Sequence, residues 1–343
     1  MVTPPASVIA GVVERVRNTT RTESRGDYHQ LTFQAMNTTC RVNFRAATAA
    51  IAEDCQKEIV EWTAAFEARY SRFIPESIIG QINLAAGRDW VEVDEETEGL
   101  FSFCGEMVFF TRGVFDPAAL PLIRLWNWKA NPPQIPDEAA IATGKDLAGW
   151  SKIQRRPRGI FLPRTGMGID LGGVGKEYAV DQVLAIARGR GLLDVLVDFG
   201  QDVRVYGQAP GKGFWNIGLE DPKQPGRCWA GVAVTNHAVA TSGDYLRAFT
   251  LNGKRYGHIL DVRDGMPVTN GCRAVTVIAA TCTMAGILST SAFVLGPQQG
   301  LDLVRLCQGA EACVLTENSK YQTRNFASYL LGSQIPRLAV LLT

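Results

Sequence analysis

Short runs of residues typical of β-strands follow one another between residues 215 and 278, and this density of strands constrains the fold most. Glycine, proline, asparagine and aspartate separate the runs, as turns require. The runs are Trp215–Leu219, Ala230–Val234, Ala238–Thr241 and Ala274–Ile278. A regular strand–helix–strand series would instead place a helix between consecutive strands. The sequence therefore predicts an α+β fold, with intertwined mixed sheets and packed helices.

Longer segments with apolar residues at helical spacing flank this region. They predict helices over Ala46–Phe73, Asp94–Arg112, Lys176–Arg190, Thr283–Leu295 and Gly300–Cys307. Further strands are expected at Met36–Phe44, Leu193–Phe199, Asp202–Gly207, Ala312–Leu315 and Tyr329–Leu331, and a hairpin at Gly159–Leu162 with Met167–Leu171. We expect an extension over residues 1–35, a single domain over residues 36–343 and a proline-rich surface segment at Ala130–Glu138.

Composition excludes several classes of function. The 343 residues include 35 basic and 34 acidic side chains, so the chain has no overall field that would recruit nucleic acid or an anionic membrane. The first residues lack the pattern of a secretory signal, and no apolar stretch is long enough to span a membrane, so we expect a cytoplasmic protein. The eight cysteines have no zinc-site spacing and are expected to be buried thiols.

The segment Asp170–Ala179 (DLGGVGKEYA) places three glycines between an apolar strand and an amphipathic helix. Gly172 and Gly173 would let the backbone approach a ligand closely, and the N–H groups at a helix start suit a phosphate. Lys176 adds a positive charge for the same anion. A glycine-containing turn with a purely structural role is an equally common reason for such a segment.

A second segment, Gly257–Val268, combines four charged or titratable side chains. His258 has the chemistry of a general base near neutral pH, and Arg263 that of a pyrophosphate ligand. Asp261 and Asp264 complete the cluster. The alternative is a polar turn after a strand.

Three shorter motifs combine hydroxyls, carboxylates or aromatic rings. Thr241, Ser242 and Gly243 could bind a ribose or a phosphate, although a hairpin turn in which Gly243 adopts a positive φ is the simpler interpretation. Tyr70 with Ser71, and Phe115 with Asp116, each place an aromatic ring beside a polar group. Aromatic residues at helical spacing are more often part of a core than of a cofactor site.

In order along the chain, these motifs resemble the FAD:protein FMN transferase family, known as ApbE. The resemblance runs through Met36–Thr39, Tyr70–Phe73, Gly113–Pro117, Asp170–Gly173, Lys176, Thr241–Tyr245, His258–Asp261, Thr290 and Phe293–Gly296. It covers about residues 36 to 330 and implies an ApbE/T-fold-like architecture. Several short motifs in the right order are more specific than any one of them.

The resemblance implies a protein that binds FAD, uses Mg²⁺ on the pyrophosphate and transfers FMN to a threonine or serine hydroxyl of a target flavoprotein. It assigns catalysis to His258 as base, together with Asp261. FAD binding falls on Tyr70, Ser71, Phe115, Asp116, Asp170, Gly172, Gly173, Lys176, Thr241, Ser242, Gly243 and Arg263. Tyr70 and Phe115 are the candidates for flavin contact.

The chain departs from the family pattern at the metal site. The resemblance assigns the Gly175 carbonyl and the Thr290 hydroxyl to Mg²⁺, but Gly286 occupies the position of the family's aspartate ligand. Magnesium prefers carboxylate oxygens, so the absence of this aspartate should weaken metal binding. Asp264 or Glu177, which stands where the family has a small residue, are candidate substitutes.

Two hypotheses follow. The first is an active flavin transferase with a rebuilt metal site. The second is a non-catalytic flavin-binding or scaffold subunit of a larger assembly, which kept the pocket and lost magnesium-dependent transfer.

Overall fold

The computed structural model describes residues 3–128, 130, 132–244 and 248–332. The chain divides into two compact units. The first contains Met1–Ala10, Glu67–Gly173 and Leu246–Asn270, and the second contains Gly11–Phe66, Val174–Tyr245 and Gly271–Thr343. The chain passes between the two units several times along the sequence.

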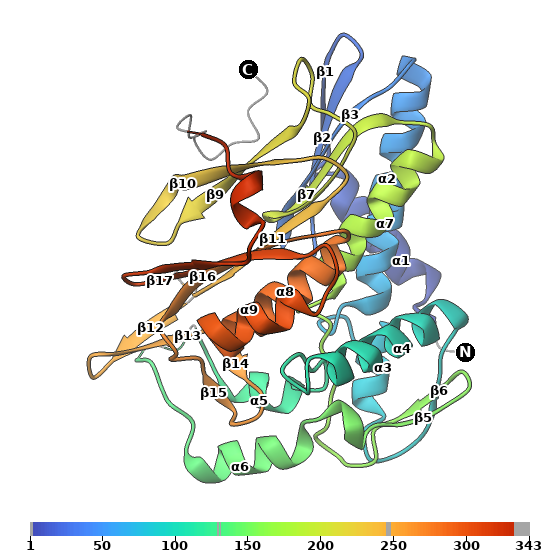
Figure 1. Cartoon of the computed structure of the whole chain (residues 1–343). Helices are drawn as coiled ribbons and strands as arrows, with labels where there is room; N and C mark the ends of the chain where they lie inside the picture. The colour runs from blue at the N-terminus through green and yellow to red at the C-terminus, as the bar shows by residue number, and fades with distance from the viewer. Residues whose placement is uncertain (1–2, 129, 131, 245–247, 333–343) are drawn as a thin grey trace. The chain divides into compact units, whose positions relative to one another are not determined.

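The second unit is built on a large antiparallel sheet of nine strands among the described residues, in the order β1-β2-β3-β7-β8-β11-β16-β17-β18 (Figure 1). The strands are β1 Arg21–Arg25, β2 Tyr28–Ala35, β3 Thr38–Arg45, β7 Leu193–Phe199, β8 Asp202–Tyr206, β11 Ala238–Gly243, β16 Cys272–Ala279, β17 Glu311–Thr316 and β18 Lys320–Gln322. Because β2 pairs with β3 along its whole length, residues 21–35 extend the same sheet.

Different layers cover the two faces of this sheet. Helices α7 (Gly175–Gly189), α8 (Cys282–Leu295) and α9 (Pro297–Arg305) pack against its strands and against one another (Figure 1). A hairpin of β9 (Trp215–Asp221) and β10 (Gln224–Val234) covers the other face. On β8, Asp202 and Arg204 form ion pairs with α7, whereas Val203 and Val205 belong to an apolar cluster with residues of the hairpin. This alternation follows from the two-residue period of a strand.

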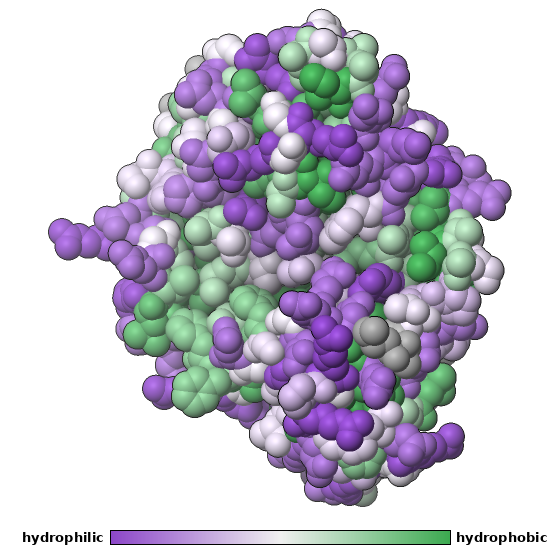
Figure 2. Space-filling view, turned by 90° about the vertical axis from the view of Figure 1, so that its right-hand side faces the viewer, coloured by the Kyte–Doolittle hydropathy of each residue, from purple (hydrophilic) through white to green (hydrophobic). Residues whose placement is uncertain are grey.

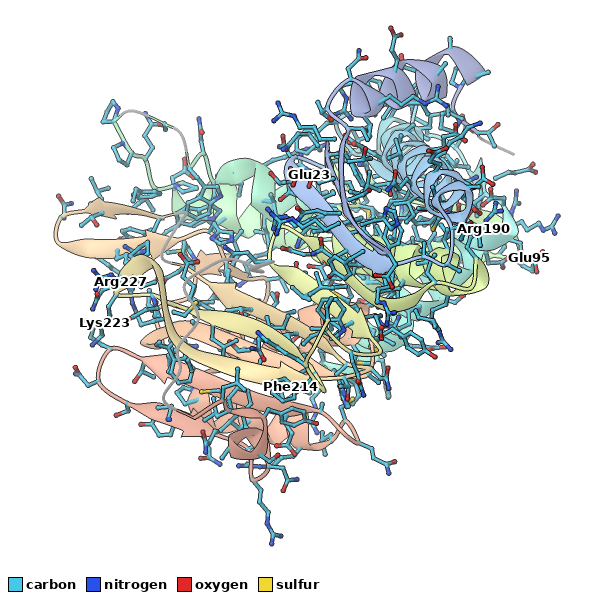
Figure 3. The ribbon with its side chains drawn as sticks, turned by 90° about the horizontal axis from the view of Figure 1, so that it is seen from above. Glu23, Glu95, Arg190, Phe214, Lys223 and Arg227 are labelled. Carbon is cyan, nitrogen blue, oxygen red and sulfur yellow. The ribbon has the colours of Figure 1, made fainter. Side chains whose placement is uncertain are left out.

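The edge strand β1 is exposed and carries three charged side chains. All five of its residues are exposed, and Glu23 on this strand is labelled in Figure 3. Lys223 and Arg227 lie at the end of the β9–β10 hairpin in the same view. Charged side chains on exposed edges oppose aggregation.

Four α-helices lie wholly within the described residues of the first unit, α3 (Ile78–Leu84), α4 (Glu95–Phe110), α5 (Leu120–Leu125) and α6 (Glu138–Leu147). It also contains small sheets formed by β4 (Val91–Glu92) with β6 (Gly159–Phe161) and β5 (Gln154–Arg156), by β12 (Ala248–Leu251) with β13 (Lys254–Gly257), and by β14 (Leu260–Asp261) with β15 (Met266–Pro267). Asp94 caps α4 by accepting a hydrogen bond from the Thr97 N–H at 3.0 Å. Gly113, with φ of 76°, follows the end of the same helix.

The predicted α+β class is confirmed, and the long helices begin and end within a few residues of their expected bounds. Helix α2 covers Ala49–Tyr70 of the predicted 46–73. The hairpin prediction is wrong in one arm, because β6 pairs with β5 and residues 167–171 are not a strand. Similarly, only Leu330 of the predicted strand at 329–331 makes a single bridge, to Val232.

One face of the described part of the chain is mainly hydrophilic (Figure 2), and most of the cysteines are buried. Figure 2 shows one face on which hydrophilic residues predominate and hydrophobic residues form separate groups. No helix of the described residues is long and apolar enough to cross a membrane. The eight cysteines are free, and all but Cys307 are buried. The described residues of the proline-rich segment are exposed or half-buried, and Asn131 lies outside them.

Candidate functional site

The glycine loop runs out of the first unit and leads directly into α7 of the second. Asp170 is fixed by its N–H, which donates to the Pro117 carbonyl at 2.8 Å, and by an ion pair with Arg72 Nε at 2.9 Å. Its Oδ1 accepts a hydrogen bond from the Gly172 N–H at 2.9 Å. Gly172 and Gly173 themselves are exposed. The loop is therefore held at its acidic end and leaves its glycine backbone accessible to a ligand.

Phe115 lies beside this loop, since a Cβ added to Gly173 would come within 3.9 Å of its ring. The ring is largely buried. Asp116 accepts hydrogen bonds from the backbone of Trp150 at 2.9 Å and of Ala118 at 2.8 Å. Burial raises the pKa of the Asp116 carboxyl above its usual range, although these hydrogen bonds act in the opposite direction. Asp116 thus stabilises the turn that presents Phe115.

Tyr70 ends α2 and is a core residue, with 5% of its surface exposed. Its hydroxyl lies 3.1 Å from Thr97 Oγ1 and accepts a hydrogen bond from Arg69 at 3.4 Å. Burial raises the pKa of this phenol. Ser71 accepts a hydrogen bond from the Phe73 N–H through its hydroxyl, at 3.3 Å. The polar groups of both residues therefore serve the local structure, and their contact with a flavin stays a prediction.

The histidine segment lies at the end of β13 and in the β14–β15 hairpin of the first unit. His258 is half-buried. Asp261 is bound by Arg263 through Nε at 2.8 Å and Nη2 at 2.6 Å. Burial alone would raise the pKa of Asp261, but these hydrogen bonds hold it below its usual value. Asp264 is exposed, and its Oδ1 accepts a hydrogen bond from the Met266 N–H at 2.8 Å.

Lys176 has partners that the sequence did not indicate. Its ammonium forms an ion pair with Asp202 and donates to the Phe199 carbonyl at 3.1 Å. Asp202 is the first residue of β8, a strand that packs against α7. Only 8% of Asp202 is exposed, so the pair is largely withdrawn from water. The positive charge of Lys176 is thus already balanced within the second unit.

The predicted cluster of residues 241–243 is a strand rather than a turn, because Gly243 pairs with Ala274 as the last residue of β11. The strand directs neighbouring side chains to opposite faces. Thr241 Oγ1 lies 2.9 Å from Thr276 Oγ1. Ser242 instead faces α8, where its Oγ lies 2.9 Å from both Ser289 Oγ and Thr290 Oγ1. Tyr245, the last residue of this motif, lies outside the described residues.

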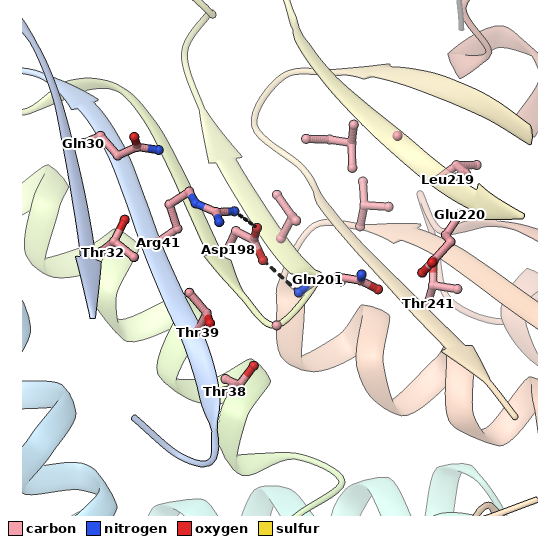
Figure 4. A pocket seen from close by; sticks show the side chains of 15 residues that line it. Gln30, Thr32, Thr38, Thr39, Arg41, Asp198, Gln201, Leu219, Glu220 and Thr241 are labelled. Carbon is pink, nitrogen blue, oxygen red and sulfur yellow. Dashed lines mark hydrogen bonds and ion pairs between the residues drawn. The ribbon is translucent and has the colours of Figure 1, made fainter. Parts of the chain in front are cut away.

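A cavity of about 640 Å³, lined by both polar and apolar residues, opens on the hairpin side of the sheet (Figure 4). Arg41 and Asp198 meet at its wall with 3.2 Å between Nη1 and Oδ2, and the Gln201 N–H also donates to Asp198 (Figure 4). Burial raises the pKa of Asp198. Of the predicted site residues, Thr241 alone is among those lining this cavity in the described part of the chain. The cavity is therefore separated by the sheet from the hydroxyl cluster at Ser242.

Helices α7 and α8, which pack against each other, carry two of the predicted metal-site positions. Gly175 is the first residue of α7, and Thr290 is half-buried on α8, one turn after Gly286. The side chain of Glu177, in the first turn of α7, fills the space above Gly286. A Cβ added to Gly286 would lie 2.6 Å from Glu177 Cγ and 3.3 Å from its Oε1. No group of three histidine, cysteine, aspartate or glutamate side chains with metal-site geometry occurs in the described residues.

Comparison with known proteins identifies the family. The model of the ApbE family matches residues 36–314. A FAD:protein FMN transferase of Klebsiella pneumoniae is 32% identical over 247 residues, covering 71% of this chain and 76% of that protein. One from Treponema pallidum is 29% identical over 69% of this chain and 70% of its own length.

Solved structures have the same fold. The crystal structure of the ApbE protein from Thermotoga maritima superposes with a TM-score of 0.78 at 30% identity, covering 88% of this chain and 99% of that one. The flavin transferase ApbE from Vibrio cholerae gives a TM-score of 0.79 at 22% identity, covering 90% of this chain and 100% of that one. The second likeness concerns the fold alone.

Proposed function

The chain belongs to the ApbE family, and on that premise we propose that it transfers FMN from FAD to a threonine or serine hydroxyl of an acceptor flavoprotein. The match of the family model over residues 36–314 carries this proposal. The 32% identity with a FAD:protein FMN transferase supports it, because that protein's name states the same reaction.

The reaction is a phosphoryl transfer. The acceptor oxygen forms a bond to the phosphorus on the FMN side of the FAD pyrophosphate, and the bond from that phosphorus to the bridging oxygen breaks. AMP leaves, and the hydroxyl proton moves to the His258 imidazole. Such a reaction depends mainly on positioning and on neutralising the charge of the phosphates.

Three groups of this chain fit the roles of binding and orienting FAD. The exposed backbone of Gly172 and Gly173 can approach the pyrophosphate, and Phe115 lies next to it for an aromatic contact. Arg263 offers a guanidinium whose orientation is set by Asp261. We assign Asp261 to this positioning role, because both of its oxygens bind Arg263. Lys176, already paired with Asp202, fixes the start of α7 and adds little uncompensated charge.

A magnesium ion, when bound, would neutralise negative charge on the pyrophosphate. The residues present fit such an ion because they offer oxygen atoms on neighbouring helices. Thr290 lies one turn after Gly286 on α8, and Glu177, whose buried Oε2 has no hydrogen-bond partner among the described residues, packs over Gly286. The Gly175 carbonyl and the Thr290 hydroxyl are the further oxygen ligands that we assign.

The second candidate function is flavin binding without transfer, as a subunit of an assembly. The glycine at position 286 favours it, since no carboxylate stands at that position on α8. The two functions differ in whether a covalent product forms.

The test is incubation of the full chain with FAD, MgCl₂ and extract from cells that lack this chain, as the source of acceptor. Flavin fluorescence that remains on a protein band after denaturation, together with released AMP, is the expected result. A His258→Ala variant should give neither. Bound FAD with no labelled protein and no AMP would refute the transferase and favour the second candidate.

A further inference from the structure

Glu177 is a buried carboxylate with an unsatisfied oxygen. The residue is 7% exposed, and its Oε2 has no hydrogen-bond partner in the described part of the chain. Its other oxygen lies 3.8 Å from the Lys176 ammonium, which is longer than a hydrogen bond. A charged oxygen left without a partner in a buried position is costly, and natural proteins seldom keep one without a ligand or a function.

A neighbouring carboxylate on the same helix provides a direct comparison. Asp181, one turn after Glu177, caps the start of α8 and accepts hydrogen bonds from Cys282 N at 2.8 Å, Thr283 N at 2.9 Å and Thr283 Oγ1 at 2.6 Å. Its charge is balanced by Arg204 at 2.8 Å. Asp181 is therefore fully explained as a structural residue. Glu177 has no such set of partners, although an acidic residue in a first helical turn has some favourable interaction with the helix dipole.

Glycine at position 286 is what allows Glu177 to lie across α8. The three atoms nearest to a Cβ added at Gly286 all belong to Glu177, at 2.6, 3.1 and 3.3 Å. Contacts below 3 Å are too close for two carbon atoms, so a side chain at 286 and this conformation of Glu177 exclude one another. The carboxylate of Glu177 therefore occupies the region that a short side chain from position 286 would otherwise reach.

Hydroxyl oxygens gather on the helix that carries Gly286. Ser242, Ser289 and Thr290 form a chain of hydroxyls on the α8 face, with 2.9 Å between neighbouring oxygens, and Ser289 also donates to the Gly286 carbonyl at 3.0 Å. The Lys176 ammonium pairs with Asp202 and lies 3.8 Å from Glu177 Oε1, so a single positive charge faces two carboxylates. A site rich in hard oxygen donors with net negative charge favours a divalent cation such as Mg²⁺.

We propose that the Glu177 carboxylate is the anionic ligand of a divalent-cation site with the Thr290 hydroxyl, supplied from α7 across the gap that Gly286 leaves on α8. The inference rests on the proposed function for the purpose of the ion, which would serve the FAD pyrophosphate. Positions 177 and 286 are then coupled, because a carboxylate at either position can complete the site.

The experiment is a titration of the full chain with Mn²⁺, a magnesium substitute whose free form is measured by electron paramagnetic resonance. Glu177→Gln keeps the shape of the side chain and removes its charge, and it should weaken Mn²⁺ binding at least ~10-fold. Glu58→Gln is the matched control, because Glu58 is a half-buried glutamate of the same unit whose carboxylate is paired with Arg190. Binding should be unchanged in this control.

A second variant moves the carboxylate to α8. Glu177→Ala combined with Gly286→Asp should recover Mn²⁺ binding that Glu177→Ala alone loses, and circular dichroism verifies that each variant is folded. Equal Mn²⁺ affinity in wild type and Glu177→Gln would overturn the inference, even if the chain transfers FMN. Conversely, Glu177-dependent Mn²⁺ binding in a chain that labels no acceptor would support the site and refute the transferase.

Discussion

Substitution of Gly286 by alanine tests the packing of Glu177 on α8 without any metal or flavin. Alanine is better than glycine by about 1 kcal/mol in a helix interior. At this position, however, the new Cβ would lie 2.6 Å from Glu177 Cγ. Overpacking of a buried contact costs roughly 1–3 kcal/mol, so we expect a net destabilisation of up to ~2 kcal/mol in the wild-type background.

In a Glu177→Ala background the three colliding atoms are gone, and the sign should reverse, with Gly286→Ala stabilising by about 1 kcal/mol. The free energies of unfolding come from urea denaturation, and the double-mutant cycle gives the coupling between the two positions. Gly99→Ala on α4 is the control, because a Cβ there meets nothing within 4 Å and should stabilise both backgrounds equally. The same effect of Gly286→Ala in both backgrounds would refute the packing that we describe.

Three further predictions concern the charged and hydroxyl groups of the site. Lys176→Met leaves the buried Asp202 without its cation and should lower the free energy of unfolding by about 3 kcal/mol in urea denaturation. Adding Asp202→Asn should recover most of the lost stability. A double variant no more stable than Lys176→Met would contradict the pairing. The pKa of Asp261 is depressed in the folded state, so the stability that this carboxylate contributes is present above its unfolded pKa and is lost as the pH falls through the folded pKa. Arg263→Gln removes the hydrogen bonds but leaves the burial, and should therefore raise the Asp261 pKa in a carboxyl NMR titration. An unchanged pKa would count against the bidentate pair. Tyr70→Phe should cost about 1 kcal/mol of unfolding free energy by removing its hydroxyl bond, and an unaltered stability would show that this bond contributes nothing.

The elements with strong periodicity could be predicted from the sequence. Strand β7 has the bounds that the apolar run Leu193–Phe199 indicates, and α7 differs from its predicted range by one residue at each end. Both have apolar residues at the spacing of their own secondary structure. Residues 167–171, which were wrongly predicted as one arm of a hairpin, lack such a conclusive spacing of apolar residues. The apolar residues of this segment are buried by tertiary packing instead, without strand pairing.

The site could be predicted only as far as local motifs allow. Thr241 and Ser242 belong to one motif, yet a strand sends them to opposite faces of the sheet, and that separation requires β11 to be recognised as extended. Asp202 pairs with Lys176 from 26 positions away, through the adjacency of β8 and α7. The sequence left Glu177 and Asp264 as equal substitutes for the missing ligand. Only the packing of α7 on α8 distinguishes Glu177, by placing its carboxylate over Gly286.

The most direct test of the account is the mass of an acceptor flavoprotein after incubation with FAD and the full chain, measured over a series of Mg²⁺ concentrations for wild type and Glu177→Gln. We predict that the wild type adds one FMN to the acceptor, and that Glu177→Gln requires at least ~10-fold more Mg²⁺ to reach the same extent of labelling. An acceptor whose mass never changes, at any Mg²⁺ concentration and with FAD bound to the chain, would contradict the transferase assignment.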